Sequence, residues 1–135
     1  MMMSRVGLRR GLSAMALVML SAVSAGTQGD IAPVRVVRLV AERFTFTPSE
    51  VTVTEGTIVE FRIKSEDTSH GFHLAGPSDI NVEIPKRGRG DVRVKFEATT
   101  VGVYVFECSR LCGAGHDFMR GSVRVIPKPT PSAPE

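Results

Sequence analysis

The sequence predicts an all-β fold, a Greek-key β-sandwich of about seven or eight short strands in roughly 100 residues. Three observations lead to this prediction. Apolar and polar residues alternate in short runs, Gly and Pro separate these runs, and no long stretch keeps a helical period. A sandwich of this size buries an adequate core, although the fold alone implies no function.

The first half of the chain supplies three predicted strands or strand pairs. Residues 34–40, VRVVRLV, form the first strand. Residues 44–53 alternate apolar and polar side chains on either side of a break at Pro48. After a turn at Gly56, residues 59–63 alternate apolar and charged side chains, which is the pattern of an antiparallel strand buried on one face.

The second half continues the pattern up to the C-terminal tail. Residues 80–84, INVEI, predict a short strand, and residues 86–90, KRGRG, predict a charged turn. Residues 91–98 again alternate. Residues 101–108, VGVYVFEC, are apolar on both faces, which is typical of a central strand, and residues 121–126 form the last strand.

The two ends of the chain differ from this central domain. Three arginines and the apolar run from Gly11 to Val23 precede the small residues that end at Ala25, so residues 1–25 are expected to be a cleaved signal peptide. The run is 13 residues long, short of the roughly 20 that a membrane span needs, and we expect no span in the mature chain. Residues 26–126 form the predicted domain, and the proline-rich residues 127–135 a disordered tail.

Charge excludes one class of function. The leader holds three of the 17 basic residues, so its removal leaves 14, equal to the 14 acidic residues. A neutral domain gives no reason to expect nucleic-acid binding. Removal of the leader would also remove five of the six methionines and leave only Met119.

A single short segment, ECSRLCGAGHDFMRG, concentrates the reactive side chains. Cys112 follows Cys108 by four residues, His116 follows four residues later, and Met119 three after that. A disulfide is the simplest interpretation of two cysteines in an exported protein, but it needs neither His nor Met beside it. Gly113 and Gly115 in the same segment would let the backbone wrap tightly around a small object.

This mixture of donors points to a soft metal. Thiolates and a thioether select copper over calcium or magnesium, and their combination with imidazole is more typical of copper than of structural zinc. A further ligand is expected from EDTSHGFHLAG, where His70 and His73 are the candidates. This segment directly follows the strand predicted at residues 59–63, and in a sandwich the end of that strand would lie beside the loop that carries the two cysteines.

The segments SHGFHLAG and INVEI, followed by ECSRLCGAGHDFM, resemble the dinuclear copper A domain of cytochrome c oxidase subunit II and of nitrous oxide reductase, which is a cupredoxin. The resemblance spans roughly residues 40–126, and the two-cysteine loop is its most specific part.

The resemblance implies a ligand set for two copper ions. Cys108 and Cys112 would bridge both ions, and His70 and His116 would each bind one. Met119 and the backbone carbonyl of Arg110 would be weak axial ligands. His73 matches a position that binds no metal in the family. No catalytic acid, base or nucleophile is implied, and the apolar side chains of Phe72, Leu74 and Phe118 are expected to shield the site or to form the rim where a partner docks.

The chain also departs from the oxidase family. Arg110 stands where the family commonly has a glutamate, whose side chain reaches a separate metal at the boundary with the catalytic subunit of the oxidase. The chain also has no tryptophan. These departures weaken the interpretation as an ordinary oxidase subunit without affecting the copper ligands.

The leading hypothesis is therefore an exported, periplasmic one-electron carrier. It would be a monomer that exchanges electrons with a redox partner such as cytochrome c or a terminal oxidase, either free or attached to a membrane respiratory complex. Two alternatives remain: a periplasmic copper-binding chaperone or storage protein, and a structural or adhesion sandwich closed by a Cys108–Cys112 disulfide.

Overall fold

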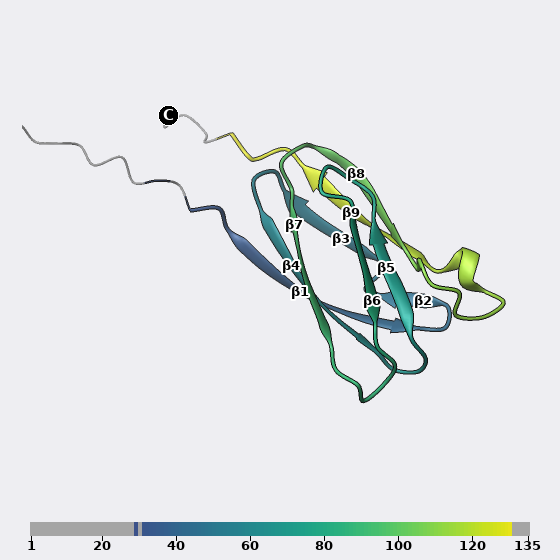
Figure 1. Ribbon diagram of the computed structural model, residues 1–135. Coiled ribbons are helices and arrows are strands. Elements are labelled where there is room, and N and C mark those ends of the chain that lie inside the picture. The colour runs from purple at the N-terminus through teal and green to yellow at the C-terminus, as the bar shows by residue number, and fades with distance from the viewer. Residues whose placement is uncertain (1–28, 30, 131–135) are drawn as a thin grey trace, which may run out of the picture.

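The computed structural model of the chain describes residues 29 and 31–130. These residues form two β-sheets packed face to face, which confirms the prediction of an all-β sandwich (Figure 1). One sheet has four strands in the order β2-β1-β4-β7, and the other has five in the order β3-β9-β8-β5-β6. The helical content of the described residues is a single short 3-10 turn.

The elements follow one another along the chain with short connections. Their bounds are β1 Val34–Glu42, β2 Thr45–Thr47, β3 Glu50–Thr54, β4 Ile58–Ser65, β5 His70–Leu74, β6 Ile80–Ile84, β7 Val92–Glu97, β8 Gly102–Glu107, η1 His116–Phe118 and β9 Arg120–Ile126.

The pairing of β4 differs in part from the sequence expectation. The strand is antiparallel to β7 but parallel to β1, so the antiparallel prediction is wrong on one of its two edges. The reason lies in the connection, because β3 crosses to the other sheet and leaves β1 and β4 as neighbours that run in the same direction. Side-chain alternation along one strand carries no information about the direction of the next.

Strand β5 was not predicted from the sequence. Its segment was identified only as a source of candidate ligands after the end of β4. Four of the five β5 residues are buried, so the apolar–polar alternation that marks the other strands is missing here. Pairing with β6 along its whole length and with β8 at one end makes it a strand.

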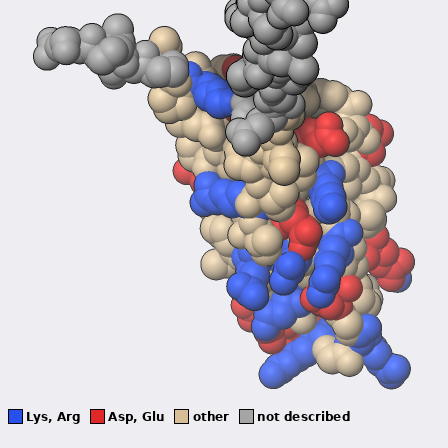
Figure 2. All heavy atoms as spheres, turned by 90° about the vertical axis from the view of Figure 1, so that its left-hand side faces the viewer, with Lys and Arg blue, Asp and Glu red and all other residues tan. Residues whose placement is uncertain are grey.

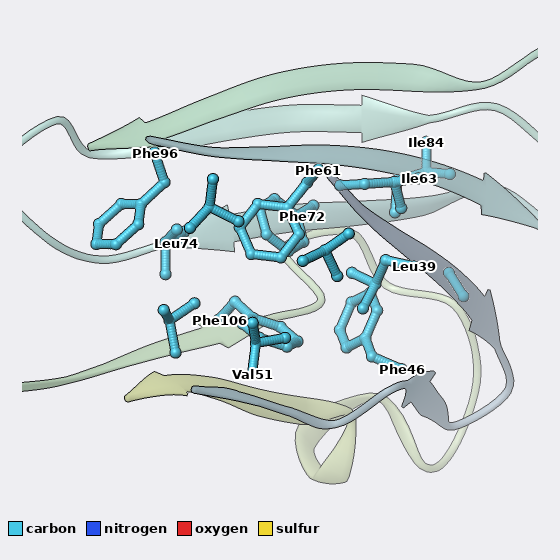
Figure 3. Close-up of a cluster of buried hydrophobic side chains, with 14 of the residues drawn as sticks. Leu39, Phe46, Val51, Phe61, Ile63, Phe72, Leu74, Ile84, Phe96 and Phe106 are labelled. Carbon is cyan, nitrogen blue, oxygen red and sulfur yellow. The ribbon is translucent and has the colours of Figure 1, made fainter. Parts of the chain in front are cut away.

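Phenylalanine rings from both sheets meet in the core (Figure 3). Phe46 and Phe61 come from the four-stranded sheet, and Phe72 and Phe106 from the five-stranded sheet. Their centroids lie 5.3 to 6.2 Å apart, mostly in tilted or edge-on arrangements that aromatic pairs favour. Cys108, Cys112 and Met119 belong to the same buried cluster, so the predicted ligand loop is anchored in a rigid core.

The outer face of β8 is more exposed than the sequence suggests. The strand lies between β9 and β5, as expected of a central strand. Val103 and Val105 nevertheless point outward and are 55% and 45% exposed. The prediction of a central strand is confirmed, but its apolar outer face is not covered, because no described segment packs over this side of the five-stranded sheet.

The predicted signal peptide, residues 1–25, lies outside the described residues. Residues 127–130 of the predicted tail have no regular secondary structure, and residues 131–135 also lie outside the described part. Within residues 29 and 31–130, no helix has the length and apolar character that a membrane crossing requires.

Candidate metal centre

The segment between β8 and β9 forms a closed loop at one end of the sandwich. The Cys108 amide donates to the Met119 carbonyl at 3.0 Å and joins the two ends of the loop. Between them, the 3-10 turn η1 begins at His116 and ends just before Met119. The loop therefore turns four candidate ligands back toward one another, although they are spread over 12 residues of sequence.

The two cysteine sulfurs lie side by side without a bond. Cys108 Sγ and Cys112 Sγ are 3.6 Å apart, and both residues are only 5% exposed. A disulfide would require about 2.0 Å. Both cysteines are free thiols, and a metal bound to both sulfurs at about 2.3 Å each would fit between them.

One histidine faces each sulfur. His70 Nδ1 lies 3.9 Å from Cys108 Sγ, and His116 Nδ1 lies 3.8 Å from Cys112 Sγ. The donor atoms of His70, Cys108 and Cys112 all lie within 4.8 Å of one another. The start of β5 thus adds a candidate ligand from a part of the sequence 38 residues away from Cys108.

Two weaker donors complete the group. Met119 Sδ lies 3.9 Å from Cys112 Sγ, and the Cys108 thiol donates to the Arg110 carbonyl at 3.0 Å. Met119 is wholly buried. All six positions that the sequence analysis names thus lie together, and each of the two weaker donors adjoins a different cysteine.

Asp67 orients His70 and was missed by the sequence analysis. Its Oδ1 lies 2.6 Å from His70 Nε2. Because a carboxylate at Nε2 keeps the imidazole proton on that nitrogen, the Nδ1 lone pair is free to face the sulfurs. The signal available in the sequence was the spacing DxxH, an acidic residue three positions before a candidate ligand.

Arg43 joins the two segments that carry the ligands, and nothing in the sequence indicated this role. Its backbone amide donates to Asp67 Oδ2 at 2.9 Å, and its side-chain Nε donates to the Cys112 carbonyl at 2.8 Å. The turn after β1 therefore ties the turn before His70 to the loop that carries Cys112.

Close packing around the loop requires glycine at particular positions. A Cβ on Gly71 would lie 2.2 Å from Ser109 Oγ and 2.8 Å from the Arg110 amide nitrogen. A Cβ on Gly115 would lie 2.3 Å from the ring of Phe44, and one on Gly113 would lie 2.9 Å from it. Besides the backbone freedom that the sequence suggests, Gly113 and Gly115 therefore make room for the ring of Phe44.

Two side chains of the site have shifted pKa values. Burial, together with the neighbouring Cys108, raises the pKa of the Cys112 thiol to about 11. Burial would also raise the pKa of Asp67, but hydrogen bonds from His70 and from the amides of Arg43 and Thr68 outweigh it and lower that pKa to about 2. The carboxylate is thus charged at neutral pH while the Cys112 thiol keeps its proton until a metal displaces it.

The remaining sequence candidates lie outside the sulfur group. His73 Nε2 contacts Asp79 Oδ1 at 2.8 Å, and its Nδ1 lies 3.8 Å from Glu107. Phe72 and Leu74 are core residues, whereas Phe118 is 83% exposed at the edge of the loop.

The Arg110 side chain points away from the sulfurs as well. Its guanidinium forms an ion pair with Glu83 at 2.6 Å, which ties the loop to β6. Ser109 Oγ donates to Asn81 at 2.8 Å and reinforces the same contact.

Known proteins share both the sequence pattern and the fold. The chain is 36% identical over 89 residues to cytochrome c oxidase subunit 2 of Thermus thermophilus, a match that covers 66% of this chain and 64% of the relative. A solved heme-copper terminal oxidase dimer contains a similar chain, with 31% identity and a TM-score of 0.56 over 68% of this chain and 65% of that one. The chain carries a cupredoxin domain of the copper A type.

Other solved cupredoxins show the same fold at lower identity. The periplasmic domain of cytochrome oxidase subunit II from Bradyrhizobium japonicum has a TM-score of 0.58 and 19% identity over 68% of this chain and 83% of its own. Auracyanin A, a blue copper protein of Chloroflexus aurantiacus, has a TM-score of 0.55 and 22% identity over 69% of this chain and 99% of its own. No protein-family model matches the sequence. The chain spans less than two thirds of the curated subunit 2 relatives.

The donor set of this cupredoxin domain fits copper. Two thiols, two imidazoles and a thioether are soft or intermediate donors that suit copper better than hard cations. Hydrogen bonds with Asp67 and Arg43 hold His70 and the Cys112 backbone carbonyl in place. The site is therefore preorganised for a soft metal.

Proposed function

We propose that this domain transfers single electrons through a dinuclear copper centre. Cys108, Cys112, His70 and His116 would hold the two ions, and Met119 and the Arg110 carbonyl would be weaker ligands. The observation that carries the proposal is the pair of free sulfurs 3.6 Å apart with a histidine nitrogen facing each. A mononuclear site would need only one of these cysteines.

The protein contributes a rigid and dry setting. When bound, the copper pair supplies a one-electron couple whose charge is shared through the two thiolates. Asp67 holds the ring of His70, and Arg43 holds the carbonyl of Cys112, so the donors need little movement. Burial of both cysteines and of Met119 excludes water from the sulfurs.

The partner and the location follow from the relatives in part. Proteins named cytochrome c oxidase subunit 2 are similar to this domain, and we infer that it works in an exported, periplasmic setting with a terminal oxidase complex or a cytochrome c as its redox partner. Leu111 and Phe118, 81% and 83% exposed beside the metal loop, offer apolar contacts for transient docking of a monomeric domain. The comparisons give no support for a copper chaperone.

Arg110 sets this chain apart from an ordinary oxidase subunit. Its side chain forms an ion pair with Glu83, and a guanidinium cannot bind a metal outside the copper pair as a carboxylate would. We infer that the domain supplies the copper centre without the additional metal contact that a glutamate at this position makes in the resembling oxidases.

Reconstitution with copper tests the function directly. We expect about two copper ions per chain, a purple mixed-valence absorption spectrum, and an electron paramagnetic resonance signal shared by two copper nuclei. One copper per chain with a blue, single-copper spectrum would refute the dinuclear assignment. Voltammetry should then give a fast, reversible one-electron wave; ready loss of copper to a chelator without such a wave would contradict electron transfer.

Fractionation of cells that express the native protein tests the location. Recovery of the domain with a haem–copper complex after detergent extraction would support an oxidase-bound carrier. Recovery in the exported soluble fraction would support a free carrier, and retention inside the cell would refute the exported setting.

A further inference from the structure

The outer face of the four-stranded sheet carries a row of arginines. In the register of this sheet, Arg38 of β1 lies opposite Arg62 of β4, and Arg62 lies opposite Arg93 of β7. Figure 2 views the side of the molecule that carries these strands and shows Lys and Arg side chains gathered on it, with fewer acidic ones between them. This face is on the opposite side of the sheet from the buried residues Phe61 and Ile63.

This row works against stability in the isolated domain. Like charges directly opposite one another on neighbouring strands repel. Arg62 is paired with Glu60 at 2.8 Å, but Arg38 and Arg93 make no hydrogen bond or ion pair with any residue in the described part of the chain. Glu60, whose pKa is lowered by its hydrogen bond with Arg62, also feels the charge of Arg93, so one carboxylate is shared among several cations and the row keeps an excess of positive charge.

The row borders a hollow. Its volume is about 360 Å³, and four basic side chains and one carboxylate contribute to its lining, together with Leu39 and Val40. The charged residues are Arg38, Arg62, Lys64, Arg93 and Asp91. The hollow is within the size range of small-ligand sites, and its lining favours an anion.

We propose that this hollow binds a phosphate-bearing anion, either a soluble diphosphate or the phosphate of a lipid headgroup. Guanidinium groups match phosphate oxygens through paired, charge-assisted hydrogen bonds. An anion with two negative groups would neutralise the two arginines that lack partners and remove the repulsion along the row. The site is independent of the metal centre, since the lining residues and the copper ligands do not overlap.

Titration calorimetry with pyrophosphate, and sedimentation with phosphatidylglycerol vesicles, test the proposal on the full chain. We expect saturable binding that weakens as salt is added. The double variant Arg38→Gln/Arg93→Gln should weaken binding at least about tenfold, the loss expected for two charge-assisted contacts. The control Lys86→Gln/Arg89→Gln removes the same charge from the turn between β6 and β7, outside the hollow, and should change affinity less than about twofold.

Folding is monitored by thermal unfolding. The double variant should be at least as stable as the wild type because it relieves repulsion. Should it unfold, Arg93→Gln alone is titrated, with a several-fold loss expected. Copper-loaded and reduced, metal-free chains should bind pyrophosphate equally.

Each outcome decides the proposal. Variant-sensitive binding of pyrophosphate supports a soluble ligand, and variant-sensitive binding of vesicles alone supports a lipid headgroup. Absence of binding to both probes overturns the proposal, as does equal weakening in the double variant and the control. The proposal is also overturned if the chain binds poly-glutamate but neither phosphate probe, or if only the metal-free chain binds the phosphate probes.

Discussion

Asp67 Oδ1 lies 2.6 Å from Nε2 of His70, whose side chain is completely buried, while the other ring nitrogen faces Cys108. A second carboxylate–histidine pair exists at Asp79 and His73, where the histidine faces no sulfur. The two pairs have similar local chemistry and differ in what lies beyond the imidazole. This contrast supplies a matched experiment.

We predict that Asp67→Ala weakens copper binding about 10–100-fold, because His70 loses the partner that fixes its tautomer and ring position. Competition with a copper chelator measures the change. Asp79→Ala is the control and should leave copper affinity within about twofold of the wild type. Equal losses in the two variants would show that general loss of charge, and not orientation of His70, is responsible.

Substitutions of the two kinds of sulfur donor, the cysteine thiols and the Met119 thioether, should affect copper binding to different extents. Cys112→Ser should abolish the dinuclear signal because a bridge is lost, whereas Met119→Leu should keep two copper ions and mainly shift the reduction potential. Copper analysis and voltammetry on both variants provide the comparison. Loss of copper to the same extent in both would mean that the bridging and axial roles are wrongly assigned.

Gly71→Ala should destabilise the metal-free protein by about 1–3 kcal/mol, the usual cost of overpacking. The new methyl group would overlap Ser109 Oγ and the Arg110 amide, so the ligand loop must move away from β5. Chemical denaturation measures the loss, and copper stoichiometry shows whether the displaced loop still closes. Gly29→Ala, with open space around its Cβ, should have no measurable effect; an unchanged Gly71→Ala protein would disprove the close contact.

The stability of the reduced, metal-free protein should depend on alkaline pH through Cys112. Burial raises the pKa of this thiol to about 11 from 9.0, so the folded state holds the proton more tightly than the unfolded state. The resulting stabilisation is complete below about pH 9 and is lost as the pH rises toward 11. Thermal midpoints should therefore fall more steeply over this interval in the wild type than in Cys112→Ser. Parallel curves would contradict the shift.

His73→Ala should leave the copper spectrum unchanged, because both ring nitrogens of His73 face carboxylates and neither faces a sulfur. The hydrogen bond with Asp79 raises the pKa of His73 above its ordinary 6.5. The folded state therefore gains stability from this histidine below about pH 6.5 and loses it as the pH rises through the raised pKa. Thermal midpoints of the wild type and His73→Ala should converge above that range; a spectrum altered by the substitution would place His73 in the metal site.

The sequence by itself determined the all-β class and indicated the candidate ligands of the loop. Strand periodicity is a local property that reports which side chains are buried, and Cys108, Cys112, His116 and Met119 are close in sequence before the chain folds. His70 was predicted through the family resemblance, and Asp67 was within reach as an acidic residue three positions before it. The missed strand β5 shows the limit of periodicity, because burial of nearly every side chain removes the alternation.

Only the tertiary structure decided which segments meet. Arg43 donates to the carbonyl of Cys112 across 69 residues, and Arg38, Arg62 and Arg93 form one row because β1, β4 and β7 are neighbours in register. Such contacts depend on strand order and direction, which follow from the packing of the two sheets against each other. A local pattern specifies which face of a strand is buried, but the neighbour across the sheet is set by long-range packing.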